Sequence, residues 1–187
     1  LFGILGNLIL SFSKLLNQKA IHKPSAQHVL DEDYYKRIEA IQFTMSHDDG
    51  KKMDDIENAD VILLGVSRTS KTPTSIYLAN RGYKTINIPL VPNQNIPKGL
   101  SDNQTACVVG LIADPERLAD IRRNRVAIMK DYKLKDYTDL QFIKKELLES
   151  KNIFKRNNWP VIDVTRRSVE ETAASILKII EIKKRQK

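Results

Sequence analysis

A short apolar run that leads directly into a phosphate-binding pattern constrains this chain more than any other feature. Residues 61–64, Val-Ile-Leu-Leu, form the continuous apolar segment expected of a strand buried on both faces of a sheet. Residues 65–72 then match the pattern G-x-x-x-x-G-K-S/T, except that Ser70 occupies the place of the second glycine. After the loop, Thr72 as N-cap with Pro73 at the first helical position predicts a helix. Strand, loop and helix in this order form the context that a phosphate-binding loop requires.

The loop has a physical reason to bind an anion. Its backbone amides and the positive end of the following helix point at one place, so a phosphate there gains hydrogen bonds and favourable dipole energy. Lys71 adds a mobile positive charge, and Thr72 is expected to hold the metal ion that accompanies a nucleotide. The predicted nucleotide-binding residues are Gly65, Val66, Ser67, Arg68, Thr69, Ser70, Lys71 and Thr72. The alternative is an ordinary strand-to-helix turn with a surface lysine, which the strand and helix context disfavours.

Serine at position 70 constrains the backbone of the loop, because it carries the Cβ that glycine lacks. It must keep a negative φ or adopt an uncommon positive one. The neighbouring Ser67, Arg68 and Thr69 supply further donors for a phosphate.

Apolar strands and amphipathic helices alternate after residue 58. Strands are predicted over residues 61–64, 85–91, 107–112 and 161–164, and helices after residues 72, 114, 139 and 168. Before them, a helix capped by Asp31 is expected to end near residues 47–50. Asp114 before Pro115, and a capping box from Ser168 to Glu171, mark two of the helix starts. The alternation predicts an α/β fold with a mainly parallel sheet and flanking helices, preceded by a short helical segment.

The positive charge of the chain is concentrated in its last third. Residues 1–115 hold 12 basic and 12 acidic side chains, whereas residues 116–187 hold 19 and 11. Such an excess suits nucleic acid, phosphorylated ligands or an acidic protein surface, and solvated helix faces are an equally good explanation. With no recognised nucleic-acid motif and only 6% aromatic residues for base stacking, we expect no nucleic-acid partner.

Cysteine content and apolar runs bear on the compartment. The single cysteine, Cys107, stands in an apolar run and is expected to be a buried structural thiol. Residues 1–10 are interrupted by two glycines and an asparagine, and fall short of the ~20 residues that a membrane span needs. We therefore expect a cytoplasmic protein with no membrane partner, although a plant organelle after removal of a transit peptide would give the same pattern.

Two further groups of polar residues are candidates for chemistry. His47, Asp48 and Asp49 offer a general base for a hydroxyl and metal contacts, and the alternative is a helix C-cap. Asp114 could orient a metal, but its role as N-cap is favoured. Four arginines on the helix that follows are placed either to reach phosphates or to form a solvated basic face: Arg117, Arg122, Arg123 and Arg125.

Several separated segments together resemble the regulatory proteins of pyruvate, phosphate dikinase and of phosphoenolpyruvate synthase. The resemblance extends from about residue 27 to residue 177. It rests on residues 27–31, 37–41, 47–50, 65–75, 77–83, 115–118 and 159–173. It implies a P-loop-kinase-like catalytic domain over residues 27–187, with residues 1–26 as the end of a truncated N-terminal portion or a linker.

The resemblance also implies an activity. Members of the family act as bifunctional kinase and phosphorylase on a threonine of the dikinase or the synthase. The β-phosphoryl group of ADP moves to the threonine hydroxyl and leaves AMP. In the reverse direction inorganic phosphate attacks the phosphothreonine and pyrophosphate forms. The expected cofactors are ADP, inorganic phosphate and a divalent metal, Mg²⁺.

Carried onto this sequence, the resemblance makes residues 65–72 the ADP-binding loop. Lys71 stabilises charge on the transferred group, and Asp48 or Asp49, beside His47, is the expected base. Ser70 mildly favours pyruvate, phosphate dikinase over phosphoenolpyruvate synthase as the protein substrate. Two points stay open. The chain could be a nucleotide-binding module without transfer activity, and it could assemble as a homodimer.

Overall fold

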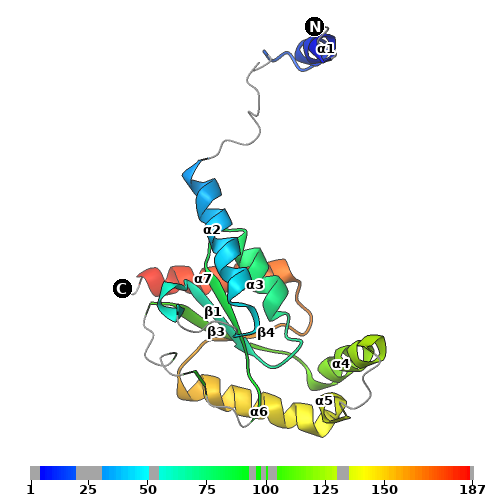
Figure 1. Ribbon diagram of the computed structural model, residues 1–187, viewed down its shortest axis with the longest axis vertical. Helices are drawn as coiled ribbons and strands as arrows, with labels where there is room; N and C mark the ends of the chain where they lie inside the picture. Colours follow the sequence, from blue (N-terminus) through cyan, green and yellow to red (C-terminus); the bar gives the residue numbers. More distant parts are fainter. Residues whose placement is uncertain are drawn as a thin grey trace. The chain divides into compact units, whose positions relative to one another are not determined.

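Four parallel strands form one sheet in the order β2-β1-β3-β4, with helices on both faces (Figure 1). The strands are β1 (Val61–Gly65), β2 (Thr85–Pro89), β3 (Cys107–Ile112) and β4 (Val161–Asp163). Val61 of β1 is in register with Thr85 on one side and with Cys107 on the other. The architecture confirms the predicted α/β class and is consistent with a P-loop-kinase-like fold.

The computed structural model describes residues 5–19, 31–50, 55–92, 96–97, 100, 105–129 and 135–185 of the 187-residue chain. The chain divides into two compact units, Leu1–Tyr34 and Tyr35–Lys187. The domain boundary predicted at residues 26 and 27 lies outside the described residues.

The first unit contains helix α1 (Gly6–Leu15), which has no buried residue. Its large apolar side chains are exposed, among them Phe12 and Leu15. Across the parts of the chain that the structure describes, every helix is too short or too polar to cross a lipid bilayer.

The second unit contains the sheet and the remaining helices. These are most of α2 (Glu32–Ser46), whose first residues belong to the first unit, and all of α3 (Lys71–Ala79), α4 (Pro115–Met129), α5 (Lys135–Thr138), α6 (Leu140–Arg156) and α7 (Val169–Arg185). Two short 3-10 turns, Asp48–Gly50 and Ile56–Asn58, lie between α2 and β1. Figure 1 shows α6 on one face of the sheet and α3 with α7 on the other.

The core follows from the two-residue period of the strands. Alternate residues of a strand point to opposite faces, so Val61 and Leu63 of β1 pack with Ile176 of α7. Ile62 and Leu64 face the other way and pack in the cluster that contains Phe154 of α6. Because both faces are covered, β1 is buried along its whole length, as its continuous apolar sequence predicts.

Local capping fixes several helix starts as predicted. The Asp31 carboxylate accepts from the amide of Tyr34 at 2.8 Å, and the Asp114 carboxylate accepts from the amide of Arg117 at 2.9 Å. In the capping box, the Ser168 amide donates to the Glu171 carboxylate at 2.9 Å, and the Glu171 amide donates to the Ser168 hydroxyl at 3.1 Å. Each bond satisfies an amide that has no partner within the helix.

The start predicted for α3 is wrong. The helix begins at Lys71 with Ser70 as N-cap, and no side chain caps it. Thr72 lies within the helix, and its hydroxyl donates to the Asp48 carboxylate instead of to a helix amide. The loop before α3 turns sharply through left-handed φ angles of 73° at Arg68 and 57° at Ser70, so the helix starts earlier than predicted. The predicted strands over 85–91 and 161–164 also end earlier, at Pro89 and Asp163.

Candidate functional site

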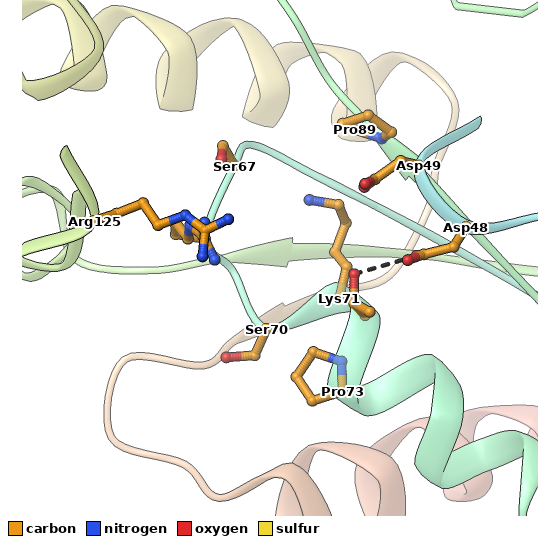
Figure 2. Close-up of a pocket in the computed structure, with 10 residues that line it drawn as sticks. Asp48, Asp49, Ser67, Ser70, Lys71, Pro73, Pro89 and Arg125 are labelled. Atoms are coloured by element: carbon orange, nitrogen blue, oxygen red, sulfur yellow. Dashed lines mark hydrogen bonds between the residues drawn. The ribbon is translucent and has the colours of Figure 1, made fainter. Parts of the chain in front are cut away.

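The loop between β1 and α3 borders a pocket of about 530 Å³. The loop leaves the carboxyl end of β1, and Pro89, which also lines the pocket, is the last residue of β2. In open α/β sheets, ligands bind at this edge, where neighbouring connections leave the sheet in opposite directions. The lining residues, seen in Figure 2, are Asp48, Asp49, Ser67, Arg68, Ser70, Lys71, Thr72, Pro73, Pro89 and Arg125.

Seven of the predicted site residues therefore come together in one cavity, from two separate segments of the chain. Gly65, Val66 and Thr69 are buried beside it and shape the loop from within. Arg125 of α4 reaches the pocket, whereas Arg117 and Arg123 are exposed and are not among the lining residues. Asp114 is an exposed N-cap, in agreement with the role favoured from the sequence.

Gly65 is required by a close approach of the backbone. A Cβ at this position would stand 2.6 Å from the carbonyl oxygen of Leu111 and 2.8 Å from the hydroxyl of Thr69. Real Cβ atoms do not approach other atoms so closely, so only glycine lets β3 and the loop pack together here.

The backbone of the loop holds two residues in the left-handed region. Ser70 adopts the uncommon positive φ that the sequence left as one of two options, at 57°. Such a conformation costs about 1–3 kcal/mol for a residue other than glycine. The carbonyl of Val66 accepts two bonds across the loop, from the Thr69 hydroxyl and from Lys71 Nζ, each at 2.9 Å. These bonds support the loop from inside.

Lys71 is buried, and this changes its acidity. Burial disfavours the charged form and lowers the pKa of Lys71 from 10.5 to about 8. The negative charge of Asp49 opposes this shift, and the positive charge of Arg122 adds to it. Figure 2 shows the Asp49 carboxylate directed toward the part of the pocket that holds the Lys71 ammonium group. A bound phosphate would favour the charged form of the lysine.

Asp48 is held by two neighbours. The Thr72 hydroxyl lies 3.2 Å from Asp48 Oδ1, and Asn87 Nδ2 lies 2.6 Å from the same oxygen. Asn87 is 1% exposed and stands in the middle of β2. The sequence pattern did not indicate it as a site residue, although a lone polar residue within an apolar strand, next to a loop that matches a phosphate-binding pattern, is a usable signal. Asp49 has a left-handed φ of 56°.

His47 is placed differently from the two aspartates. Its ring stacks on Phe43 with the ring centroids 4.0 Å apart, and it does not line the pocket. Nδ1 lies 2.7 Å from the Phe43 carbonyl, which can only accept, so this nitrogen carries a proton. Nε2 is 3.7 Å from the Asp55 carboxylate. These contacts direct the imidazole toward Phe43 of α2 and toward Asp55, and not into the pocket.

A buried arginine of α4 supports the loop through the carbonyl of Ser67. Arg122 of α4 is closed to solvent, and its guanidinium lies 2.8 Å from the Glu146 carboxylate of α6. It donates to the carbonyl of Ser67 at 3.2 Å and to the carbonyl of Tyr137 at 3.1 Å. The Tyr137 hydroxyl is 2.9 Å from Ser67 Oγ. Sequence reasoning missed Tyr137, because nothing local in its segment indicates this contact.

The donor set suits a metal ion that is shared with a ligand. Within the described part of the chain, no three His, Cys, Asp or Glu side chains gather to hold a metal on their own. Mg²⁺ is commonly held by one or two protein oxygens together with the phosphates of a substrate. Thr72 and Asp48, which both line the pocket, provide this kind of partial site.

Comparison with known proteins places the chain among close relatives. The family model described as kinase/pyrophosphorylase matches residues 1–177. A protein of Pelagibacter ubique is 64% identical over 184 residues, which cover 98% of this chain and 67% of the relative. A protein of Bartonella bacilliformis is 49% identical over 178 residues, with 95% and 63% covered. One of Sphingopyxis alaskensis is 52% identical over 171 residues, with 91% and 63% covered.

All three relatives bear the name pyruvate, phosphate dikinase regulatory protein. The chain spans 67% of the length of the first relative and 63% of the length of the other two.

Proposed function

The chain belongs to the kinase/pyrophosphorylase family, and from this membership and the geometry of its pocket we propose that it regulates pyruvate, phosphate dikinase by reversible phosphorylation. In the forward direction it transfers the β-phosphoryl group of ADP to a threonine of the dikinase. In the reverse direction it removes that group with inorganic phosphate and forms pyrophosphate.

One observation carries the proposal. A phosphate-binding loop, a buried lysine and two carboxylates from a different segment share a single pocket at the carboxyl edge of the sheet. Phosphoryl transfer depends mainly on positioning and on charge stabilisation, and this arrangement supplies both. The names of the relatives support the dikinase as the protein substrate.

In the forward direction, the threonine oxygen attacks the β-phosphorus of ADP. The bond from that phosphorus to the bridging oxygen breaks, and AMP leaves with the oxygen. The loop amides bind the phosphates, and the Lys71 ammonium balances the charge on the transferred group. A divalent cation bound with the nucleotide would supply further charge neutralisation, and Thr72 with Asp48 would hold it.

The proton of the threonine hydroxyl needs an acceptor, and Asp49 fits this role best. Asp48 is engaged by Thr72 and Asn87 through its Oδ1 atom. Asp49 lines the pocket and faces the side where Lys71 lies (Figure 2). In the reverse direction the phosphate oxygen attacks the phosphothreonine phosphorus, the threonine oxygen leaves, and the Asp49 carboxylic acid returns the proton.

The experiment that tests this function uses the dikinase itself. The purified chain is mixed with pyruvate, phosphate dikinase that carries its phosphorylated histidine, together with ADP or ATP. Threonine phosphorylation is then followed by mass spectrometry. ADP should support modification, Lys71→Ala should abolish it, and Lys155→Ala, which alters an exposed lysine of α6, should leave it unchanged.

A different result would point to another class of protein. If ADP binds but neither nucleotide supports phosphorylation, this chain is a nucleotide-binding module that lacks transfer activity.

A further inference from the structure

A buried asparagine stands behind the threonine and the aspartate that would hold the cation. Asn87 Nδ2 lies 2.6 Å from Asp48 Oδ1 and 2.9 Å from Thr72 Oγ1. Thr72 Oγ1 and Asp48 Oδ1 are in turn 3.2 Å apart. The three side chains, which come from three separate segments, thus form a closed triangle of hydrogen bonds.

The direction of each bond in this triangle is determined. An ionised carboxylate can only accept, so Asn87 presents its NH₂ group and Thr72 its O–H to Asp48. Turning the Asn87 amide over would bring two oxygens to 2.6 Å with no hydrogen between them. The hydrogens of both donors are therefore fixed by Asp48.

The hydroxyl oxygen of Thr72 still has an acceptor lone pair for a ligand. A hydroxyl has one proton and two acceptor lone pairs. The proton is given to Asp48, and one lone pair accepts from Asn87. Among the described residues no further group bonds to this oxygen, so one lone pair is left, and because Thr72 lines the pocket it can serve a ligand there. A hydroxyl whose proton is committed to a carboxylate presents only oxygen to that ligand, which suits a cation.

The oxygen end of the Asn87 amide makes no such bonds to the described residues, so the contribution of this residue to the triangle comes from its NH₂ group. Asn87 Oδ1 is buried and makes no hydrogen bond within the described residues. Leaving a buried polar atom without a partner costs about 1–3 kcal/mol. Buried groups of this kind call for an explanation, and a role at the site is one.

We infer that Asn87 is a positioning residue for cation binding. It orients Thr72 and Asp48 so that both present oxygen atoms to the divalent cation of a nucleoside diphosphate. The inference rests on the proposed function, because that function brings the nucleotide and its cation into this pocket. Asn87 itself does not line the pocket, so it acts through its two neighbours.

The test measures binding and needs no turnover. ADP binding is followed by calorimetry in EDTA and at increasing Mg²⁺ concentrations, for the unmodified chain and for Asn87→Ala. The Mg²⁺ concentration at half effect should rise about tenfold, the effect of one lost hydrogen bond to a charged group. ADP affinity in EDTA should change less than about twofold. Asn80→Ala, which removes an exposed asparagine at the end of α3, is the matched control and should change neither.

A double-mutant cycle separates positioning from general damage. Thr72→Val removes the hydroxyl and keeps the shape of the side chain, so Asn87→Ala should have little additional effect on the Mg²⁺ midpoint in that background. Thermal melting shows whether each variant folds, and Asn87→Leu, which preserves volume, takes the place of Asn87→Ala if the latter does not.

The outcomes distinguish this inference from the proposed function. If the unmodified chain shows Mg²⁺-dependent ADP binding and the Asn87 variants keep the same midpoint, the inference is wrong and the function stands. The inference is equally wrong if the variants lose ADP affinity to the same extent in EDTA. If the unmodified chain binds no ADP under either condition, the proposed function fails, and the inference with it.

Discussion

The guanidinium of Arg122 donates to the backbone carbonyl of Ser67 across 3.2 Å, from a position that solvent does not reach. A charge on α4 therefore holds the beginning of the loop between β1 and α3. The same guanidinium pairs with Glu146 of α6, whose side chain is only 11% exposed. The loop is thus connected to two helices through one buried cation.

Removing the Arg122 charge should destabilise the fold. Arg122→Met leaves the buried Glu146 carboxylate without its cation, and we expect the free energy of unfolding to fall by about 3–5 kcal/mol. Chemical denaturation measures this change. Arg123→Met is the control, because Arg123 pairs with Asp120 at the surface and should contribute about 1 kcal/mol or less. Equal losses in the two variants would contradict the structural role given to Arg122.

The Tyr137 hydroxyl should affect nucleotide affinity through its bond to the loop. Tyr137→Phe removes the bond to Ser67 Oγ and keeps both the ring under Arg122 and the backbone carbonyl. Loss of one neutral hydrogen bond predicts a two- to tenfold weaker affinity for ADP, as the loop becomes less preorganised. Calorimetry measures it, with Tyr77→Phe on α3 as the control. An unchanged affinity would show that Ser67 needs no support from α5.

ADP affinity should depend on pH through Lys71. With its pKa lowered to about 8 by burial, Lys71 loses its charge in the free protein as the pH rises through that value. We expect ADP to bind more weakly at about pH 9 than at about pH 7, and we expect Lys71→Met to lack this change. Binding titrations at several pH values provide the measurement. A pH dependence that persists in Lys71→Met would assign it to another group.

The same pKa shift should act on stability with the opposite sign. The folded pKa of Lys71 is about 8 and the ordinary value is 10.5, so the unfolded chain binds more protons between these two values. The contribution of Lys71 to the free energy of unfolding therefore rises with pH in this window and is constant below it. The difference in stability between the unmodified chain and Lys71→Met, measured by denaturation across the window, should show this rise.

Gly65 should not tolerate a side chain. In Gly65→Ala the new Cβ would meet the Leu111 carbonyl at 2.6 Å, and we expect a loss of about 1–3 kcal/mol in stability together with weaker ADP binding. Gly6→Ala is the control, since nothing lies within 4 Å of a Cβ there. A stable Gly65→Ala variant with normal affinity would mean that the loop and β3 can separate at little cost.

Much of the fold could be predicted, because it depends on local patterns. The continuous apolar run of β1 and the caps at Asp31, Asp114 and Ser168 are properties of adjacent residues, and the structure confirms them. The start of α3 could not be predicted in the same way. Its position depends on the left-handed backbone at Arg68 and Ser70, which the sequence leaves undetermined.

The supporting residues of the site were beyond local reasoning for another reason. Asn87 and Tyr137 contribute through contacts with residues far away in the chain, and neither belongs to a motif. The sequence indicates Arg122 only as one of several basic residues on its helix. Its burial against Glu146 appears only when α4 and α6 are packed together.

The bond between Ser67 and Tyr137 joins residues 70 positions apart. A chain whose later helices have not docked thus lacks this support for the pocket, and the proposed ligand ADP would favour molecules that have finished folding. At a concentration of about 100 times Kd, a ligand of this kind adds about 2.7 kcal/mol to stability. The resistance of this protein to cellular proteases would then increase with the concentration of ADP in the cell.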